Sequence, residues 1–266
     1  MKTLLILILS MGMMTSILLG KDSNLSKEER TAKFILTKHA LRSKISADTI
    51  AKSYLYIGEK IGTRQASKEK NKGLKMFKEN FEALEKSIND SRIKNLLTYM
   101  RMSYTELIET VNLPYSLDNA QIALDLSTSI GEGAELIAEQ LRDEVGRDPI
   151  VFDGLVPNIE TITKYYIAYH AGIKDENTVF LMKEAVSEVA EMIDRRSKYP
   201  GNTVEMNQNI NKAKHLWDIV YKFYLDIDSN GLPFIVLKTT TDLKKTCTKY
   251  NKSYIKKRKK EMLGKK

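Results

Sequence analysis

Apolar residues recur at intervals of three and four along most of this chain, and this spacing constrains its fold more than any other feature. The stripe Phe77, Phe81, Leu84 and Ile88 is typical of one face of an amphipathic helix. The period-two alternation of a strand is absent outside a β-branched patch at 234–241. We therefore expect an all-α protein with helices over residues 25–62, 66–89, 91–111, 115–145, 157–174, 176–198, 203–228 and 233–260.

The two halves of the chain repeat each other in order, which indicates an internal duplication. Residues 49–54 match 161–166, and the motif Leu113-Pro114-Tyr115 returns as Leu232-Pro233-Phe234. Each half would then hold four helices with one apolar stripe each. An antiparallel four-helix bundle buries four such stripes with short loops. We expect two tandem bundles, the first over 21–146 and the second, more divergent one over 147–248.

The N-terminus is typical of a secretory signal peptide. Lys2 precedes an uncharged run over 3–19, and charge returns directly after Gly20. We expect residues 1–20 to be a signal peptide cleaved after Gly20, which makes the protein periplasmic. The alternative is that residues 3–19 remain as an inner-membrane anchor with the rest of the chain facing the periplasm, since this run is close to the shortest spanning length.

The net charge of +9 comes almost entirely from the C-terminus. Residues 249–266 hold nine of the 43 basic residues and one of the 34 acidic residues, so the rest of the chain carries +1. We expect this segment to be a basic tail that meets an anionic membrane surface or an acidic partner. The alternative is a helix end whose bases complement the helix dipole. The export signal argues against nucleic acid. The five bases in its densest run are Lys256, Lys257, Arg258, Lys259 and Lys260.

The residue inventory argues against an enzyme. One cysteine, Cys247, excludes an internal disulfide framework and a multi-thiolate metal site. The chain has only three histidines and lacks nucleotide-binding and zinc-protease motifs, so no set of catalytic residues can be assembled. We therefore expect no catalytic residues, no metal and no cofactor. Glu132, Glu135 and Glu139 share a helix face, and we interpret them as a solvated surface.

The segment from Arg42 to Leu141 resembles the PilJ/NarX-like N-terminal sensor domain of bacterial chemoreceptors and histidine kinases (the type IV pili methyl-accepting chemotaxis transducer N-terminal family). The run Ile50-Ala51-Lys52-Ser53-Tyr54-Leu55-Tyr56 is similar to that family's continuation of helix one. The resemblance implies a non-catalytic periplasmic bundle that recognises a small ligand between its long helices. It also implies pairing of two copies through helix one, and hence a homodimer.

The candidate ligand-binding residues lie on the first predicted helix, facing the fourth. They are Arg42, Lys44, Asp48 and Lys52. The family's Ser-Gln-Arg core is replaced here by Ala47-Asp48-Thr49, and a carboxylate raises the cost of binding a small anion. The sequence therefore predicts a ligand site whose preference for anions is in doubt.

Two functions follow from these features. The first is an exported ligand-binding protein that acts alone or as an accessory to a membrane sensor protein. The second is a structural or interaction protein that has lost the ligand site and binds through its basic tail. A polar pocket beside Asp48 would favour the first function, and a site packed solid with side chains would favour the second.

Overall fold

The computed structural model describes residues 26–145, 154–228 and 232–262, and within these residues it is all-α, with eight helices and no strand. The predicted signal segment 1–20, with Gly20, lies outside the described residues. Among the helices that are described, none is both long and apolar enough to cross a membrane. The helices are α2 (Lys27–Gly58), α3 (Thr63–Ser87), α4 (Ser91–Asn112), α5 (Leu117–Val145), α6 (Leu155–His170), α7 (Glu176–Ser197), α8 (Val204–Leu225) and α9 (Pro233–Met262).

Each of the eight helices expected from the periodicity is present, with ends that shift by a few residues. The ambiguous patch 234–241 is helical and belongs to α9. Asp90 caps α4, because its carboxylate accepts the backbone N–H groups of Arg92 at 2.8 Å and Ile93 at 3.2 Å. Gly62 precedes α3 in the left-handed region, with φ of 56°, which suits a residue without a side chain.

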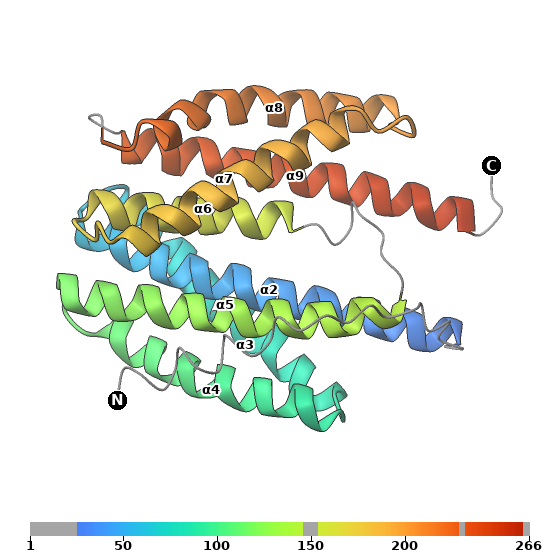
Figure 1. Cartoon of the computed structure of the whole chain (residues 1–266), viewed down its shortest axis with the longest axis horizontal. Coiled ribbons are helices and arrows are strands. Elements are labelled where there is room, and N and C mark those ends of the chain that lie inside the picture. Colours follow the sequence, from blue (N-terminus) through green and yellow to red (C-terminus); the bar gives the residue numbers. More distant parts are fainter. Residues whose placement is uncertain (1–25, 146–153, 229–231, 263–266) are drawn as a thin grey trace.

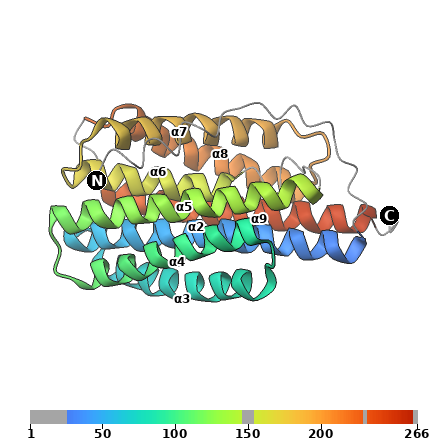
Figure 2. The same ribbon diagram turned by 60° about the horizontal axis from the view of Figure 1, so that its bottom comes forward.

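The eight helices form two four-helix bundles in chain order. Helices α2 to α5 pack together in the lower half of Figure 1, and α6 to α9 pack together in the upper half. Figure 2 shows the same division after rotation, with α2 and α5 side by side in both views. The bundles meet mainly through α2 and α6, the first helix of each. This confirms the tandem arrangement expected from the duplicated sequence.

The predicted apolar stripes form the cores of the bundles. Phe77, Phe81, Leu84 and Ile88 are buried in the first bundle. Their counterparts Met182, Val186, Val189 and Ile193 are buried in the second. Burial of each such side chain contributes roughly 1.5–3 kcal/mol. The lone cysteine, Cys247, is also buried.

The segment expected as a tail continues the last helix of the second bundle. Helix α9 runs through residue 248 to Met262, and Tyr250 and Tyr254 on it are buried. The Tyr254 ring lies 5.6 Å from that of Tyr199, beyond the end of α7. The helix continues past residue 248, the expected end of the second bundle, because its buried face extends to Tyr254.

Candidate functional site

The bundles are joined by two buried ion pairs that cross between α2 and α6. The Lys52 ammonium lies 2.6 Å from the Glu160 carboxylate, and the Lys164 ammonium lies 2.6 Å from that of Asp48. All four side chains are at most 1% exposed. Residue 48 pairs with 164 and residue 52 pairs with 160, so the two helices run in opposite directions where they cross.

The two sides of this crossing are built from the same short motif. Each helix contributes an acid, a threonine at the next position and a lysine four residues after the acid. Thr49 donates to Glu160 at 2.7 Å, and Thr161 donates to Asp48 at 2.6 Å. The network therefore has approximate two-fold symmetry, as in an isologous dimer interface. The matched segments 49–54 and 161–166 supply the threonines and lysines, and extending the match by one residue adds the acids.

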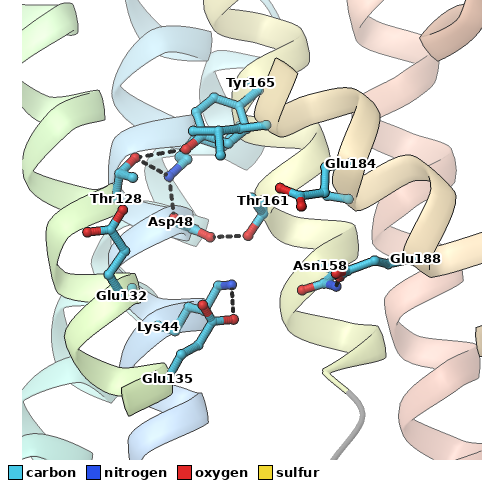
Figure 3. A pocket seen from close by; sticks show the side chains of 14 residues that line it. Lys44, Asp48, Thr128, Glu132, Glu135, Asn158, Thr161, Tyr165, Glu184 and Glu188 are labelled. Carbon is cyan, nitrogen blue, oxygen red and sulfur yellow. Dashed lines mark hydrogen bonds and ion pairs between the residues drawn. The ribbon is translucent and has the colours of Figure 1, made fainter. Parts of the chain in front are cut away.

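A pocket opens on the Asp48 side of the crossing. It is a cavity of about 200 Å³ between α2, α5, α6 and α7. Figure 3 shows Glu132 and Glu135 on the α5 side and Glu184 and Glu188 on the α7 side, with Asp48 and Thr161 between them. The remaining lining residues are Lys44, Thr128, Gly131, Asn158, Lys164, Tyr165, Leu181 and Ala185.

The pocket carries more negative than positive charge. Five carboxylates face it against two lysines, and both lysines are paired: Lys164 with Asp48, and Lys44 with Glu135 at 2.5 Å. Among the described residues, Glu132, Glu184 and Glu188 form no ion pair. Burial and the neighbouring Glu135 raise the pKa of Glu132. Burial also raises the pKa of Glu188, and the negative charges of Glu184 and Glu135 raise it further. The positive charges of Lys44 and Lys164 only partly offset this repulsion, and Glu188 accepts a hydrogen bond from Asn158.

The opposite side of the crossing holds a larger ion-pair network. Glu160 accepts from both Lys52 and Lys244, and Lys52 also lies 2.9 Å from Glu69. Burial alone would raise the pKa of Glu160, but the charges of Lys244 and Lys52 outweigh it and lower the pKa to about 2. Glu160 therefore stays ionised in the core as the shared partner of two lysines.

This network predicts acid sensitivity that depends on Glu160. A folded-state pKa of about 2 against an ordinary value of 4.5 makes its contribution complete above pH 4.5 and lost as the pH falls through 2. The contribution is on the order of 3 kcal/mol, of which about 2 kcal/mol should be lost by pH 3. Urea unfolding at pH 7 and pH 3 measures this loss, which should be absent from the Glu160→Gln variant. Equal losses in the two proteins would contradict the assignment. The raised pKa values of Glu132 and Glu188 act in the opposite direction in both proteins, because protonation there favours the folded state.

The structure separates the four residues predicted as the ligand site. Lys44 and Asp48 line the pocket. Lys52 is buried on the other side of the crossing, with Glu160 and Glu69. Arg42 is exposed and does not line the pocket. On an α-helix Arg42 is two residues from Lys44, and such residues point in different directions.

Sequence reasoning missed the acids around the pocket. Glu132 and Glu135 are exposed, as expected for a solvated face, but nothing in the sequence indicated that they also line a pocket with Glu184 and Glu188 from the other bundle. Their spacing on α5 and α7 gives no sign of this, because the pocket forms only where the bundles meet. The repeated motif around Thr49 and Thr161 was the available signal for the meeting point.

One residue of the basic run 256–260, Lys257, contacts the loop that follows α7. The Lys257 ammonium donates to the backbone carbonyl of Gly201 and lies 5.5 Å from the centre of the Tyr199 ring. Lys256, Arg258 and Lys260 are exposed on α9. Lys259 also falls within α9. The run thus forms the end of α9, and its binding to an anionic surface or an acidic partner stays a prediction.

Within the part of the chain that the structure describes, no group of three or more His, Cys, Asp or Glu side chains is placed to hold a metal ion. His39 instead lies 2.8 Å from the Asn80 side chain and joins α2 to α3.

Comparisons with protein-family models, curated proteins and solved structures give no match to this chain. The resemblance to PilJ/NarX-like sensor domains therefore stays a prediction from the sequence, and the functional argument depends on the geometry of the site.

Proposed function

We propose that this chain is an exported, non-catalytic protein that binds a small, positively charged ligand in the pocket between its two bundles. The observation that carries the proposal is the acidic pocket beside Asp48, in which Glu132, Glu184 and Glu188 have no ion-pair partner within the part of the chain that the structure describes. The uncharged run over 3–19 supports export, and the helical resemblance supports an accessory role beside a membrane sensor protein.

The lining favours a cation over the small anions expected for a NarX-like site. An anion would meet five carboxylates, while both lysines of the pocket are already engaged. An ammonium group would add positive charge beside Glu132 and Glu188, and charge-assisted hydrogen bonds are about twice as strong as neutral ones. A cavity of about 200 Å³ suits a small amine rather than a peptide or a sugar chain.

The two walls of the pocket belong to different bundles, so a ligand that contacts both walls bridges the two bundles. Glu132 and Glu135 lie on α5, and Glu184 and Glu188 lie on α7. A diamine that contacts both walls would link the bundles and reduce the repulsion across the pocket. Ligand binding would therefore stabilise the junction of α2 and α6.

Putrescine should raise the melting temperature of the full chain, whereas nitrate and aspartate should not. A ligand at one hundred times its Kd stabilises a protein by about 2.7 kcal/mol, which corresponds to roughly 5–10 °C for a chain of this size. The measurement is a thermal-shift titration at constant ionic strength. In the double variant Glu184→Gln/Glu188→Gln, the putrescine affinity should fall at least tenfold.

The matched control removes the same charge from elsewhere. Glu106 and Glu109 are exposed on α4 and do not line the pocket, so Glu106→Gln/Glu109→Gln should bind putrescine like the unmodified protein. Equal loss of affinity in both double variants would show that putrescine responds to the general surface charge and not to the pocket. Absence of any shift with putrescine would sink the ligand-binding function and favour a structural or interaction protein.

A further inference from the structure

A second groove lies on the other side of the α2–α6 crossing, where the approximate two-fold symmetry would place a counterpart of the acidic pocket. The acidic pocket lies between the fourth helix of the first bundle, α5, and the second helix of the second bundle, α7. The second groove has a volume of about 350 Å³ and lies between the second helix of the first bundle, α3, and the fourth helix of the second bundle, α9. The two sites therefore occupy equivalent positions in the duplicated fold.

The second groove has the opposite charge. Four lysines line it, Lys68 and Lys72 on α3 and Lys238 and Lys245 on α9, against the two acids Glu69 and Asp242. Glu69 is already paired with Lys52, and Asp242 lies 3.3 Å from Lys245. Within the described residues, Lys68, Lys72 and Lys238 form no ion pair. Where the first site presents four glutamates from two bundles, the second presents four lysines.

The inner wall of the groove adds neutral donors and lies in front of the buried ion-pair network. The Gln65 amide donates to Glu69 at 3.0 Å and to Thr241 at 3.2 Å, so it holds α3 against α9 beside the lysines. Lys244 is paired with Glu160 behind this wall, and burial together with the nearby Lys52 ammonium lowers the pKa of Lys244. Glu160 and Glu69 balance Lys52 and Lys244 there, so the net positive charge of the groove comes from the lysines that line it.

We propose that the groove between α3 and α9 binds a phosphate-bearing anion through Lys68, Lys72, Lys238 and Lys245. A compact ligand with several phosphate oxygens can meet ammonium groups from both helices at once, and lysine binds phosphate as a point charge. The phosphate can belong to a free small molecule or to a lipid headgroup. This site is separate from the acidic pocket, so its success or failure leaves the proposed amine site untouched.

Isothermal titration of the full chain with inorganic pyrophosphate tests the proposal. We expect binding that weakens at least tenfold in Lys68→Gln/Lys72→Gln and, independently, in Lys238→Gln/Lys245→Gln, because both walls supply charge. The matched control is Lys78→Gln/Lys94→Gln, which removes the same charge from exposed lysines outside the groove and should leave the affinity within about twofold. Circular dichroism of each variant checks that the helices persist.

A parallel arm uses vesicles of phosphatidylglycerol and, as a comparison, of phosphatidylcholine. Pyrophosphate binding that depends on both lysine pairs would support a free phosphate ligand. Binding to phosphatidylglycerol vesicles alone, with the same dependence, would support a lipid headgroup. Equal weakening in the control variant, or no binding of either probe, would overturn the proposal.

Discussion

Replacing Glu160 with leucine should lower the free energy of unfolding by about 3–5 kcal/mol, because it leaves buried lysines without a shared partner. Glu160 is fully buried and accepts from Lys52, Lys244 and Thr49. In the variant, Lys52 keeps only Glu69, and Lys244 loses its ion-pair partner. An uncompensated buried charge costs more than a lost surface contact.

Urea denaturation at pH 7 measures this change through the shift in midpoint at constant slope. The control is Glu79→Leu on α3, whose carboxylate lies 3.8 Å from Lys75 in an exposed pair. Exposed pairs of this kind contribute at most about 1 kcal/mol, so the control should stay within that range of the unmodified protein. A loss below about 1 kcal/mol for Glu160→Leu would show that water or rearrangement compensates the two lysines.

The helices could be predicted from the sequence because their signals are local. The stripe from Phe77 to Ile88 and the caps around Asp90 specify α3 and the start of α4 without reference to the rest of the chain. Even the pairing of helices into bundles follows from the repeat, since each half has four stripes to bury. The internal match therefore predicted the architecture.

The function of the charged residues could not be predicted in the same way. Lys52 was expected to contact a ligand, yet it lies outside the pocket and pairs with Glu160. Asp48 does line the pocket, but its pairing with Lys164, more than one hundred positions away, was not predicted. Whether a charged side chain on α2 faces water or a partner depends on where α6 lies, and periodicity does not contain that information. The acidic pocket could not be predicted for the same reason: Glu132 and Glu188 come from different bundles.

The symmetry of the crossing also bears on the expected homodimer. The resemblance implies that two copies pair through helix one, which corresponds here to α2. In this chain the central part of α2 is already covered by α6, the first helix of the second bundle. The first helices of the two halves thus contact each other within one chain. A dimer through the same face would require the bundles to separate.

Replacing Lys164 with methionine should destabilise the protein by about 3–5 kcal/mol, and a second change at Asp48 should restore at least half of the loss. The single variant leaves the Asp48 carboxylate buried with Thr161 as its remaining side-chain partner. In Asp48→Leu/Lys164→Met neither charge of this pair remains, and apolar replacements of buried ion pairs are often neutral or stabilising. Recovery should be incomplete, because Thr161 loses its acceptor at a cost of about 1 kcal/mol.

A double-mutant cycle of urea unfolding free energies isolates the coupling between the two residues. We expect a coupling energy of about 2 kcal/mol or more, of the sign that makes the double variant more stable than the two single losses predict. A control cycle with the exposed pair Lys198 and Asp194, which are 2.7 Å apart, should give at most about 0.5 kcal/mol. If the Asp48–Lys164 cycle is equally weak, this pair adds little to the packing of α2 on α6. The energetic role of the repeated acid–threonine–lysine motif would then rest on the Lys52–Glu160 pair alone.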